Sequence, residues 1–150
     1  MFKNILIIGF GMIGSSIARS VIKKYKNVNI FAFDKSNNLK IRINKSKLNN
    51  VIVLKSLQEI NKLNIDLIII CVPMLQYQSI FKKLSNINLD KTIVTDVGST
   101  KVNIEKLYNQ KKYKFNFIPS HPIAGIEKAG LEHGFDAVSY THLTLPTMMS

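Results

Sequence analysis

The chain has 150 residues, 46% of them apolar and 20% charged, which suits one globular domain and leaves no room for a second complete one. No run reaches the about 18 consecutive apolar residues of a membrane span, and no signal-peptide pattern opens the chain, so we expect a cytoplasmic protein with no membrane partner. The formal charge of +12 comes from lysines scattered along the chain without aromatic residues between them, so we expect a solvated basic surface and no nucleic-acid partner.

Apolar runs alternate with segments of helical spacing. Most of the runs are unbroken, as in buried parallel strands: Ile5–Ile8, Val28–Phe33, Val51–Leu54, Asp66–Val72, Thr92–Val97 and Phe115–Ile118. The intervening apolar positions predict amphipathic helices: Ile13, Ile17 and Val21; Leu57, Ile60 and Leu63 after a capping box at Ser56–Glu59; Tyr77, Ile80, Phe81 and Leu84; Ile104, Leu107 and Tyr108. This order predicts an α/β fold with a doubly wound, mostly parallel Rossmann-type sheet that binds ligands at the carboxyl ends of its strands.

A glycine-rich turn, Gly9–Gly14, follows the first predicted strand and leads into the first helix. Gly9 allows a sharp turn, Gly11 allows a pyrophosphate to approach the backbone, and Gly14 allows close helix–strand packing. Unpaired N–H groups at Met12 and Ile13 would then face the phosphates. The turn predicts a dinucleotide site; its structural alternative is a glycine turn without a ligand.

Asp34 ends the second predicted strand, 20 residues after Gly14, where an acid can accept hydrogen bonds from ribose hydroxyls. Its charge would repel a 2′-phosphate, so we expect NAD rather than NADP. Lys35 and Arg42 keep NADP open, and a strand-ending turn residue is the structural alternative for Asp34.

Two further strand ends belong to the predicted cofactor site. Cys71, Val72 and Pro73 end the fourth strand where a nicotinamide ring should lie, and Asp96 and Gly98 follow the fifth. Cys71 is expected to be a small buried apolar residue rather than a nucleophile, and as the only cysteine it excludes an internal disulfide and leaves no cysteine partner for a zinc site.

Two residues are candidates for the chemistry. His121 follows the sixth predicted strand in a Gly- and Pro-containing turn, where an imidazole could accept the proton of an alcohol as its hydride leaves. A surface position is the alternative for a histidine in a loop. Ser99 could hold this base or the substrate hydroxyl; its alternative is capping of the helix near Lys101, a role that Thr100 could take instead.

Four segments, GFGMIGSS, DLIIICVPM, TDVGSTK and SHPIAGIEKAGLEHGFDA, resemble the prephenate and arogenate (cyclohexadienyl) dehydrogenase family over residues 1 to 137. The resemblance implies oxidative decarboxylation of prephenate or arogenate with NAD or NADP, in tyrosine biosynthesis. It also implies that His121 takes the proton of the ring hydroxyl and that Ser99 is its polar partner. The family continues into a helical domain that dimerises and completes the substrate site, so we expect a homodimer for the full-length protein and no turnover by residues 1–150 alone.

The last segment, residues 138–150, does not match the family. Val138–Thr147 is similar to the translation of a transposon-based sequencing adapter, so we expect the native dinucleotide-binding domain at residues 1–137 and a cloning or assembly scar after it. The alternative is a family strand near Leu143–Pro146 that has drifted in sequence.

Two other functions stay open at this point. A different Rossmann dehydrogenase, acting on a small hydroxy acid or an imine, would share the glycine turn and Asp34 but would not need DVGS and SHPIAG. A non-catalytic NAD sensor would bind the cofactor without a base, so replacing His121 separates it from a dehydrogenase.

Overall fold

The computed structural model describes residues 1–122 and 143–144, and its centre is a sheet of six parallel strands. The order is β3-β2-β1-β4-β5-β6. The strands are β1 (Asn4–Ile8), β2 (Asn29–Phe33), β3 (Val51–Val53), β4 (Leu67–Ile70), β5 (Ile93–Asp96) and β6 (Asn116–Ile118). Each predicted apolar run overlaps one of them, and the doubly wound Rossmann-type sheet is confirmed.

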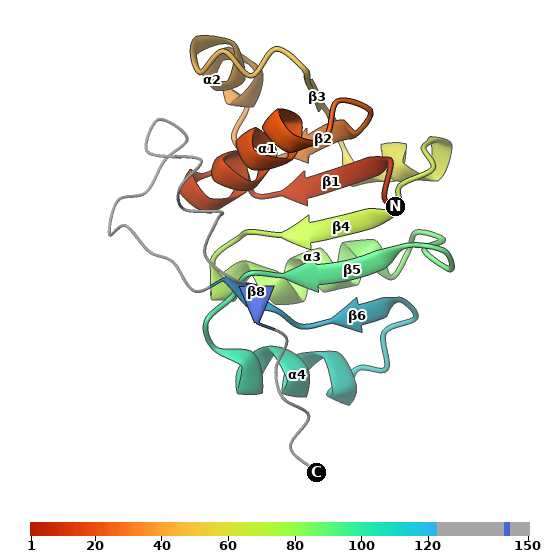
Figure 1. Ribbon diagram of the computed structural model, residues 1–150. Helices are drawn as coiled ribbons and strands as arrows, with labels where there is room; N and C mark the ends of the chain where they lie inside the picture. The colour runs from red at the N-terminus through yellow and green to blue at the C-terminus, as the bar shows by residue number, and fades with distance from the viewer. Residues whose placement is uncertain (123–142, 145–150) are drawn as a thin grey trace.

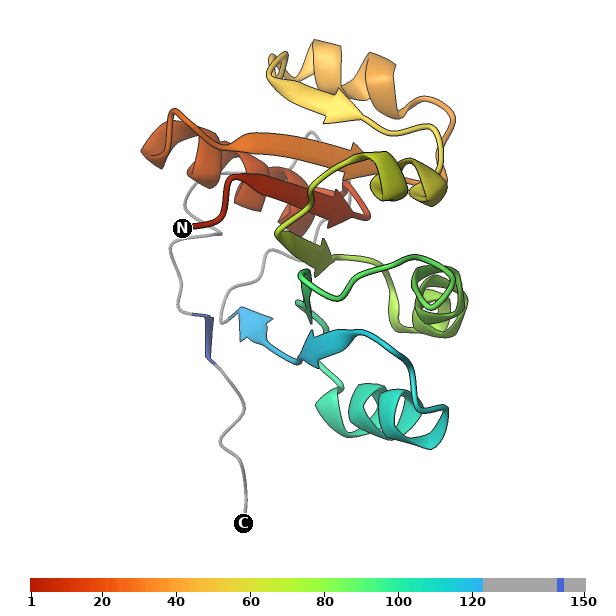
Figure 2. The ribbon, with the colours of Figure 1, turned by 90° about the vertical axis from the view of Figure 1, so that its right-hand side faces the viewer.

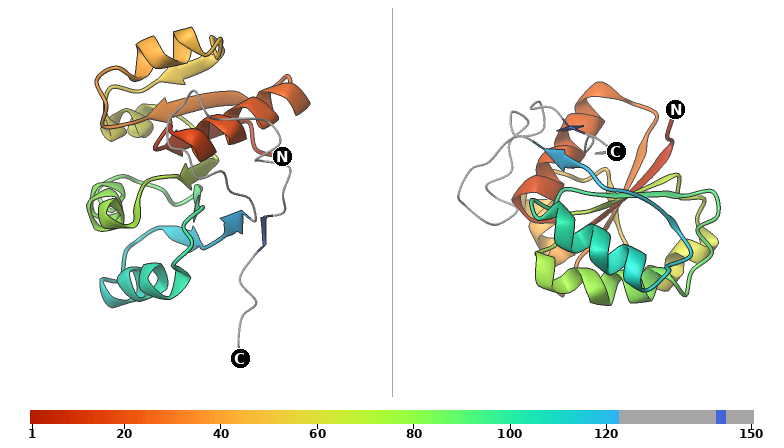
Figure 3. Two further views of the ribbon diagram at one scale, coloured as in Figure 1. Left: turned by 90° about the vertical axis from the view of Figure 1, so that its left-hand side faces the viewer. Right: turned by 90° about the horizontal axis from the view of Figure 1, so that it is seen from below.

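Helices cover both faces of the sheet. They are α1 (Met12–Lys24), α2 (Leu39–Lys45), α3 (Tyr77–Leu84) and α4 (Lys101–Gln110), with short 3₁₀ helices at Leu57–Lys62 (η1) and Met74–Gln76 (η2). Figure 1 shows α1 in front of the sheet, and the view from below in Figure 3 shows α3 and α4 together on the opposite face.

Two apolar clusters explain why the strands read as unbroken apolar runs. Along β1, Ile5 and Ile7 belong to the cluster on the α1 side, whereas Leu6 and Ile8 belong to the cluster that packs against α3 and α4. A strand buried on both faces loses the alternation of polar and apolar residues that marks a half-exposed strand. Phe81 of α3 is fully buried and meets several aromatic rings edge-on within the second cluster.

Two local details differ from or refine the sequence prediction. Helix α2 was not predicted; only Leu39 and Ile43, one helical turn apart, are buried in it, so its apolar signal is short. The segment after Ser56 forms a 3₁₀ helix, in which Glu59 accepts the N–H of Ser56 at 2.9 Å.

The carboxyl ends of all six strands lie at one edge of the sheet, and the strand order reverses direction between β1 and β4. At this edge the chain continues into β7 (His121–Pro122), which pairs antiparallel with β8 (Leu143–Thr144). Figure 2 shows β7, in light blue, beyond the end of β6. Apart from β8, the predicted scar at 138–150 lies outside the described residues, as does the boundary at Ala137.

Within residues 1–122 and 143–144, no helix is both long and apolar enough to cross a bilayer.

Candidate functional site

The glycine turn lies where β1 meets β4. Gly9 has a φ of +89°, in the left-handed region that favours glycine, and a Cβ there would lie 2.6 Å from the carbonyl oxygen of Cys71. Its N–H donates to the Phe33 carbonyl at 2.8 Å. The turn is therefore held against the strands on both sides, and a side chain at Gly9 would not fit.

Gly11 and Gly14 have different surroundings. Gly11 is the N-cap of α1, and a Cβ built on it meets no atom of the described residues within 4 Å. A Cβ on Gly14 would lie 2.3 Å from the Gly9 carbonyl oxygen. The first turn of α1 carries no acidic residue, so the open space at Gly11 faces a helix N-terminus that can attract an anion. These surroundings fit a pyrophosphate.

A cavity of about 410 Å³ opens at this edge of the sheet. It brings together several of the residues predicted to bind the cofactor: Gly9, Gly11, Asp34, Cys71, Val72 and Pro73. Lys35 and Lys83 add positive charge to its lining. Met12, Ile13 and Gly14 follow Gly11 on α1 and are not part of the lining, and neither are Asp96 and Gly98.

Asp34 is tied to the glycine turn. Its Oδ2 accepts the N–H of Phe10 at 2.8 Å, and its Oδ1 accepts the N–H of Ser36 at 3.0 Å. The Arg42 guanidinium donates to the Phe10 carbonyl at 3.5 Å. Asp34 thus lies on the cavity wall, and two backbone N–H groups orient its carboxylate. The Arg42 guanidinium is hydrogen-bonded to the glycine turn.

Cys71 follows β4 beside the cavity. Burial raises the pKa of its thiol well above the ordinary range, and the nearby Asp96 carboxylate raises it further. The group therefore stays protonated at neutral pH, which argues against a nucleophilic role.

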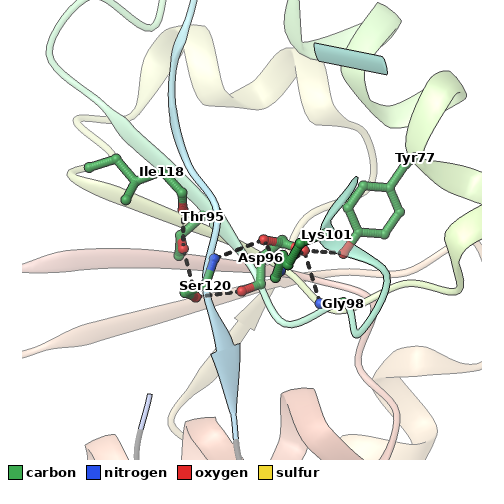
Figure 4. Close-up of polar contacts among 7 residues, drawn as sticks. All are labelled: Tyr77, Thr95, Asp96, Gly98, Lys101, Ile118 and Ser120. Carbon is green, nitrogen blue, oxygen red and sulfur yellow. Dashed lines mark hydrogen bonds and ion pairs between the residues drawn. The ribbon is translucent and has the colours of Figure 1, made fainter. Parts of the chain in front are cut away.

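A buried carboxylate, Asp96, lies at the end of β5 (Figure 4). Its Oδ2 accepts the Tyr77 hydroxyl at 2.9 Å and the Gly98 N–H at 2.9 Å, and its Oδ1 accepts the Ser120 N–H at 3.1 Å. The Lys101 ammonium lies 2.6 Å from both oxygens. The side chain of Asp96 has no solvent exposure, so these donors compensate its charge.

The same contacts affect two titratable neighbours. Burial and, after it, the charge of Asp96 raise the pKa of Tyr77 far above its usual value, so its hydroxyl remains a donor. Burial lowers the pKa of Lys101, and its hydrogen bond and charge pairing with Asp96 oppose that shift.

The two predicted catalytic residues lie on segments that join this cluster. Ser99 is exposed, directly after Gly98, and Thr100 is the N-cap of α4 without a side-chain capping bond. His121 begins β7, one residue after the buried Ser120. The Ser120 hydroxyl lies 2.6 Å from the Asp96 carbonyl oxygen and 2.9 Å from the Thr95 hydroxyl. Both segments therefore leave the sheet at the same edge.

Sequence reasoning missed the part that Tyr77, Lys101 and Ser120 play here. Tyr77 was identified only as an inward-facing helix residue, although its helical spacing gave its burial correctly. A tyrosine at a helix position that is predicted to be buried is the signal that could have identified this role, because a buried phenol hydroxyl needs a hydrogen-bond partner.

Comparison with known proteins gives consistent matches. Residues 17–143 match the family model described as "Prephenate dehydrogenase, nucleotide-binding domain". The chain is 30% identical over 147 residues to the cyclohexadienyl dehydrogenase of Zymomonas mobilis, covering 98% of this chain and 50% of that protein. It is 36% identical over 133 residues to the prephenate dehydrogenase of Lactococcus lactis, covering 86% of this chain and 36% of that protein.

A solved structure gives the same result. Prephenate dehydrogenase from Aquifex aeolicus, in complex with hydroxyphenyl propionate and NAD+, matches with a TM-score of 0.76 and 26% identity, over 93% of this chain and 48% of that one. The chain thus spans between about a third and a half of the length of these relatives.

Proposed function

The chain belongs to the prephenate dehydrogenase family, and from that premise we propose that it forms the dinucleotide-binding part of an enzyme that oxidatively decarboxylates prephenate or arogenate. The observation that carries the proposal is that two segments meet at one edge of the sheet. The residues after β5 and Ser120–Pro122 after β6 both leave the sheet there, and Asp96 accepts the N–H groups of Gly98 and Ser120. A dinucleotide site alone would not require either segment.

The residues present fit a nicotinamide dinucleotide. Gly11 leaves open space at the N-terminus of α1 for the pyrophosphate, and Asp34 lies on the cavity wall where it could accept ribose hydroxyls. Val72 and Pro73, at the end of β4, would lie beside the nicotinamide end. When bound, the cofactor supplies the hydride acceptor, and the protein supplies its orientation.

We propose NAD as the preferred form. The Asp34 carboxylate would repel a 2′-phosphate, and Arg42, a cation that could neutralise such a phosphate, is hydrogen-bonded to the Phe10 carbonyl. Lys35 and Lys83 on the cavity wall are the residues that would support NADP instead.

In the proposed reaction His121 is the base and Ser99 its polar partner. The hydrogen on the carbinol carbon of the substrate leaves as hydride, and the hydroxyl proton passes to His121. The bond between the ring and its carboxylate breaks, carbon dioxide leaves, and the electron pair of that bond completes an aromatic phenolate, which takes its proton back from His121. Aromatisation makes this step strongly downhill, so most of the protein's task is positioning the substrate hydroxyl against the base.

The relatives with a named activity are at least about twice as long as this chain. We propose that the complete protein carries the activity and is a homodimer. Residues 1–150 alone are proposed to bind the dinucleotide without turning over substrate, and residues 138–150 are proposed to be non-native. Independent sequencing of the source gene tests the last point, since recovery of the same tail in independent DNA contradicts it.

A hydride-transfer assay tests the function. The longest protein that the gene encodes is mixed with prephenate or arogenate, each with NAD or NADP, and the absorbance of the reduced cofactor is followed. Turnover on either substrate supports the proposal, and the four combinations assign both preferences. Cofactor binding without turnover on either substrate would leave only a dinucleotide-binding domain.

A further inference from the structure

Asp96 connects the two segments that carry the predicted catalytic residues. We propose that Asp96 is a positioning residue that fixes the Ser99 segment and the His121 segment relative to each other, with Tyr77 and Lys101 fixing its carboxylate. The inference rests on the proposed function, because Ser99 and His121 are the residues proposed to act there.

The connection is made through two backbone N–H groups. Gly98, one residue before Ser99, donates to Oδ2 of Asp96 at 2.9 Å, and Ser120, one residue before His121, donates to Oδ1 at 3.1 Å. One carboxylate thus spans both segments, one oxygen to each (Figure 4). A displacement of either segment must stretch a hydrogen bond to a charged acceptor, and such bonds are stronger than bonds between neutral groups.

The carboxylate is itself held from two further elements. The Tyr77 hydroxyl, at the start of α3, reaches Oδ2 at 2.9 Å, and the Lys101 ammonium, at the start of α4, lies 2.6 Å from both oxygens. Tyr77 is fully buried. Four donors from four segments therefore converge on one side chain, and in a low-dielectric site such a network defines a single arrangement.

Close packing supports the same role. A Cβ on Gly98 would lie 2.8 Å from the Tyr77 hydroxyl oxygen and 2.9 Å from Oδ2 of Asp96. The backbone at Gly98 therefore lies directly against the network, and a larger residue there would require the neighbouring side chains to shift. On the other side, the Ser120 hydroxyl lies 2.6 Å from the Asp96 carbonyl oxygen, which fixes the second segment at an additional point.

The network acts through geometry rather than through net charge. The Lys101 ammonium compensates the Asp96 carboxylate, Glu105 lies near enough to Lys101 to interact with its charge, and the Cys71 thiol is neutral. Because the Lys101 ammonium compensates the Asp96 carboxylate at contact distance, the positions of its two acceptor oxygens are what distinguish Asp96 from a neutral residue of the same size. An amide at position 96 keeps the size but replaces one acceptor with a donor, which cannot pair with an N–H group.

The test compares three variants of the longest protein that the gene encodes. Asp96→Asn removes one acceptor, Tyr77→Phe removes one of the bonds that orient the carboxylate, and Tyr108→Phe is a matched control, because the Tyr108 hydroxyl donates to the Phe115 carbonyl in the same aromatic cluster. Two properties are measured: kcat and KM for substrate and dinucleotide, and amide hydrogen exchange at Gly98 and Ser120.

We expect Asp96→Asn to lower kcat about 100-fold and Tyr77→Phe about tenfold, because small displacements of reacting groups carry costs of this size. The KM for the dinucleotide should change less than about twofold in both. Because a smaller folded fraction would lower the apparent kcat without changing KM, the folded fraction of each variant is measured by circular dichroism and kcat is expressed per folded molecule. Exchange at Gly98 and Ser120 should accelerate together in Asp96→Asn, and Tyr108→Phe should keep both kcat and the two exchange rates.

A kcat in Asp96→Asn and Tyr77→Phe equal to that of Tyr108→Phe overturns the inference, and so does faster exchange at only one of the two amides. If Asp96→Asn does not fold, Tyr77→Phe decides. If the unmodified protein turns over neither substrate, the proposed function fails while the exchange measurement still decides whether Asp96 fixes both segments.

Discussion

The carboxylate of Asp34 accepts the N–H of Phe10 at 2.8 Å, which links the end of β2 to the glycine turn after β1. Because the same carboxylate is proposed to bind the ribose, cofactor affinity and the shape of the turn depend on one side chain. The Ser36 N–H, 3.0 Å from the other oxygen, restricts its rotation.

Asp34→Asn is expected to weaken NAD binding about tenfold, because charge-assisted hydrogen bonds become neutral ones. NADP binding should weaken less, since the charge that repels the 2′-phosphate is gone, so the ratio of the two dissociation constants should narrow. Titration calorimetry with both cofactors measures this.

Asp90→Asn is the control for Asp34, because Asp90 is exposed and lies at the amino-end edge of the sheet, just before β5. It should leave both dissociation constants unchanged. If the ratio of the dissociation constants for NADP and NAD is unchanged in Asp34→Asn, the proposal that Asp34 sets a preference for NAD is contradicted.

Gly11→Ala and Gly14→Ala should separate cofactor binding from folding. A Cβ at Gly11 enters open space, so the free energy of unfolding should change by less than about 1 kcal/mol while NAD binding weakens at least about tenfold, because the methyl group occupies the proposed phosphate position. A Cβ at Gly14 would overlap the Gly9 carbonyl oxygen, so we expect a loss of about 1–3 kcal/mol despite the helix preference of alanine.

Thermal unfolding with and without NAD checks both glycine variants. NAD should raise the Tm of the unmodified protein and should raise that of Gly11→Ala much less. If Gly11→Ala binds NAD as tightly as the unmodified protein, the phosphates do not bind at Gly11.

Much of this fold follows from local pattern. Strand β1 was predictable because both faces are covered and every residue from Ile5 to Ile8 is apolar, and the turn after it because glycine spacing carries its own steric reason. Helix α2 was not predicted, because only two of its seven residues are buried and most of the others are charged or polar.

The Asp96 network could not be derived from pattern. Tyr77 and Asp96 are 19 residues apart, and Asp96 and Ser120 are 24 apart, so their contacts depend on how α3 and β6 pack against β5. Sequence reasoning gave Asp96 a place near the cofactor from its position at a strand end. The structure places its carboxylate among protein donors, which only the tertiary arrangement reveals.

Asp66 should make stability depend on pH. Its carboxylate accepts the N–H of Asn4 at 2.9 Å and that of Lys3 at 2.7 Å, and these bonds, that of Asn4 first, hold its pKa below the ordinary value. A lowered pKa in the folded state means that the stabilisation is complete above the pKa of the unfolded chain and is lost as the pH falls through the folded pKa.

Asp66→Asn should therefore lower the free energy of unfolding by about 1 kcal/mol at neutral pH, a figure reduced for solvent screening. The difference from the unmodified protein should stay constant down to about pH 5 and shrink toward zero below about pH 3. Urea unfolding across this range measures it, with Asp90→Asn as the control. A difference that grows as the pH falls would contradict the assignment.

His121→Ala is expected to lower kcat by about 100- to 10,000-fold, the usual range for removal of a positioned base, while the dissociation constant for NAD stays the same.

Ser99→Ala should lower kcat about tenfold, because it removes one hydrogen bond to the base or the substrate hydroxyl. Thr100→Ala is the matched control for Ser99: it is exposed, adjacent, and makes no side-chain capping bond to α4, so its kcat should not change. Steady-state kinetics with the preferred substrate and cofactor, together with NAD titration, distinguish the roles. A His121→Ala protein that keeps its turnover would remove the base from the mechanism, and equal losses in Ser99→Ala and Thr100→Ala would reduce Ser99 to a structural residue.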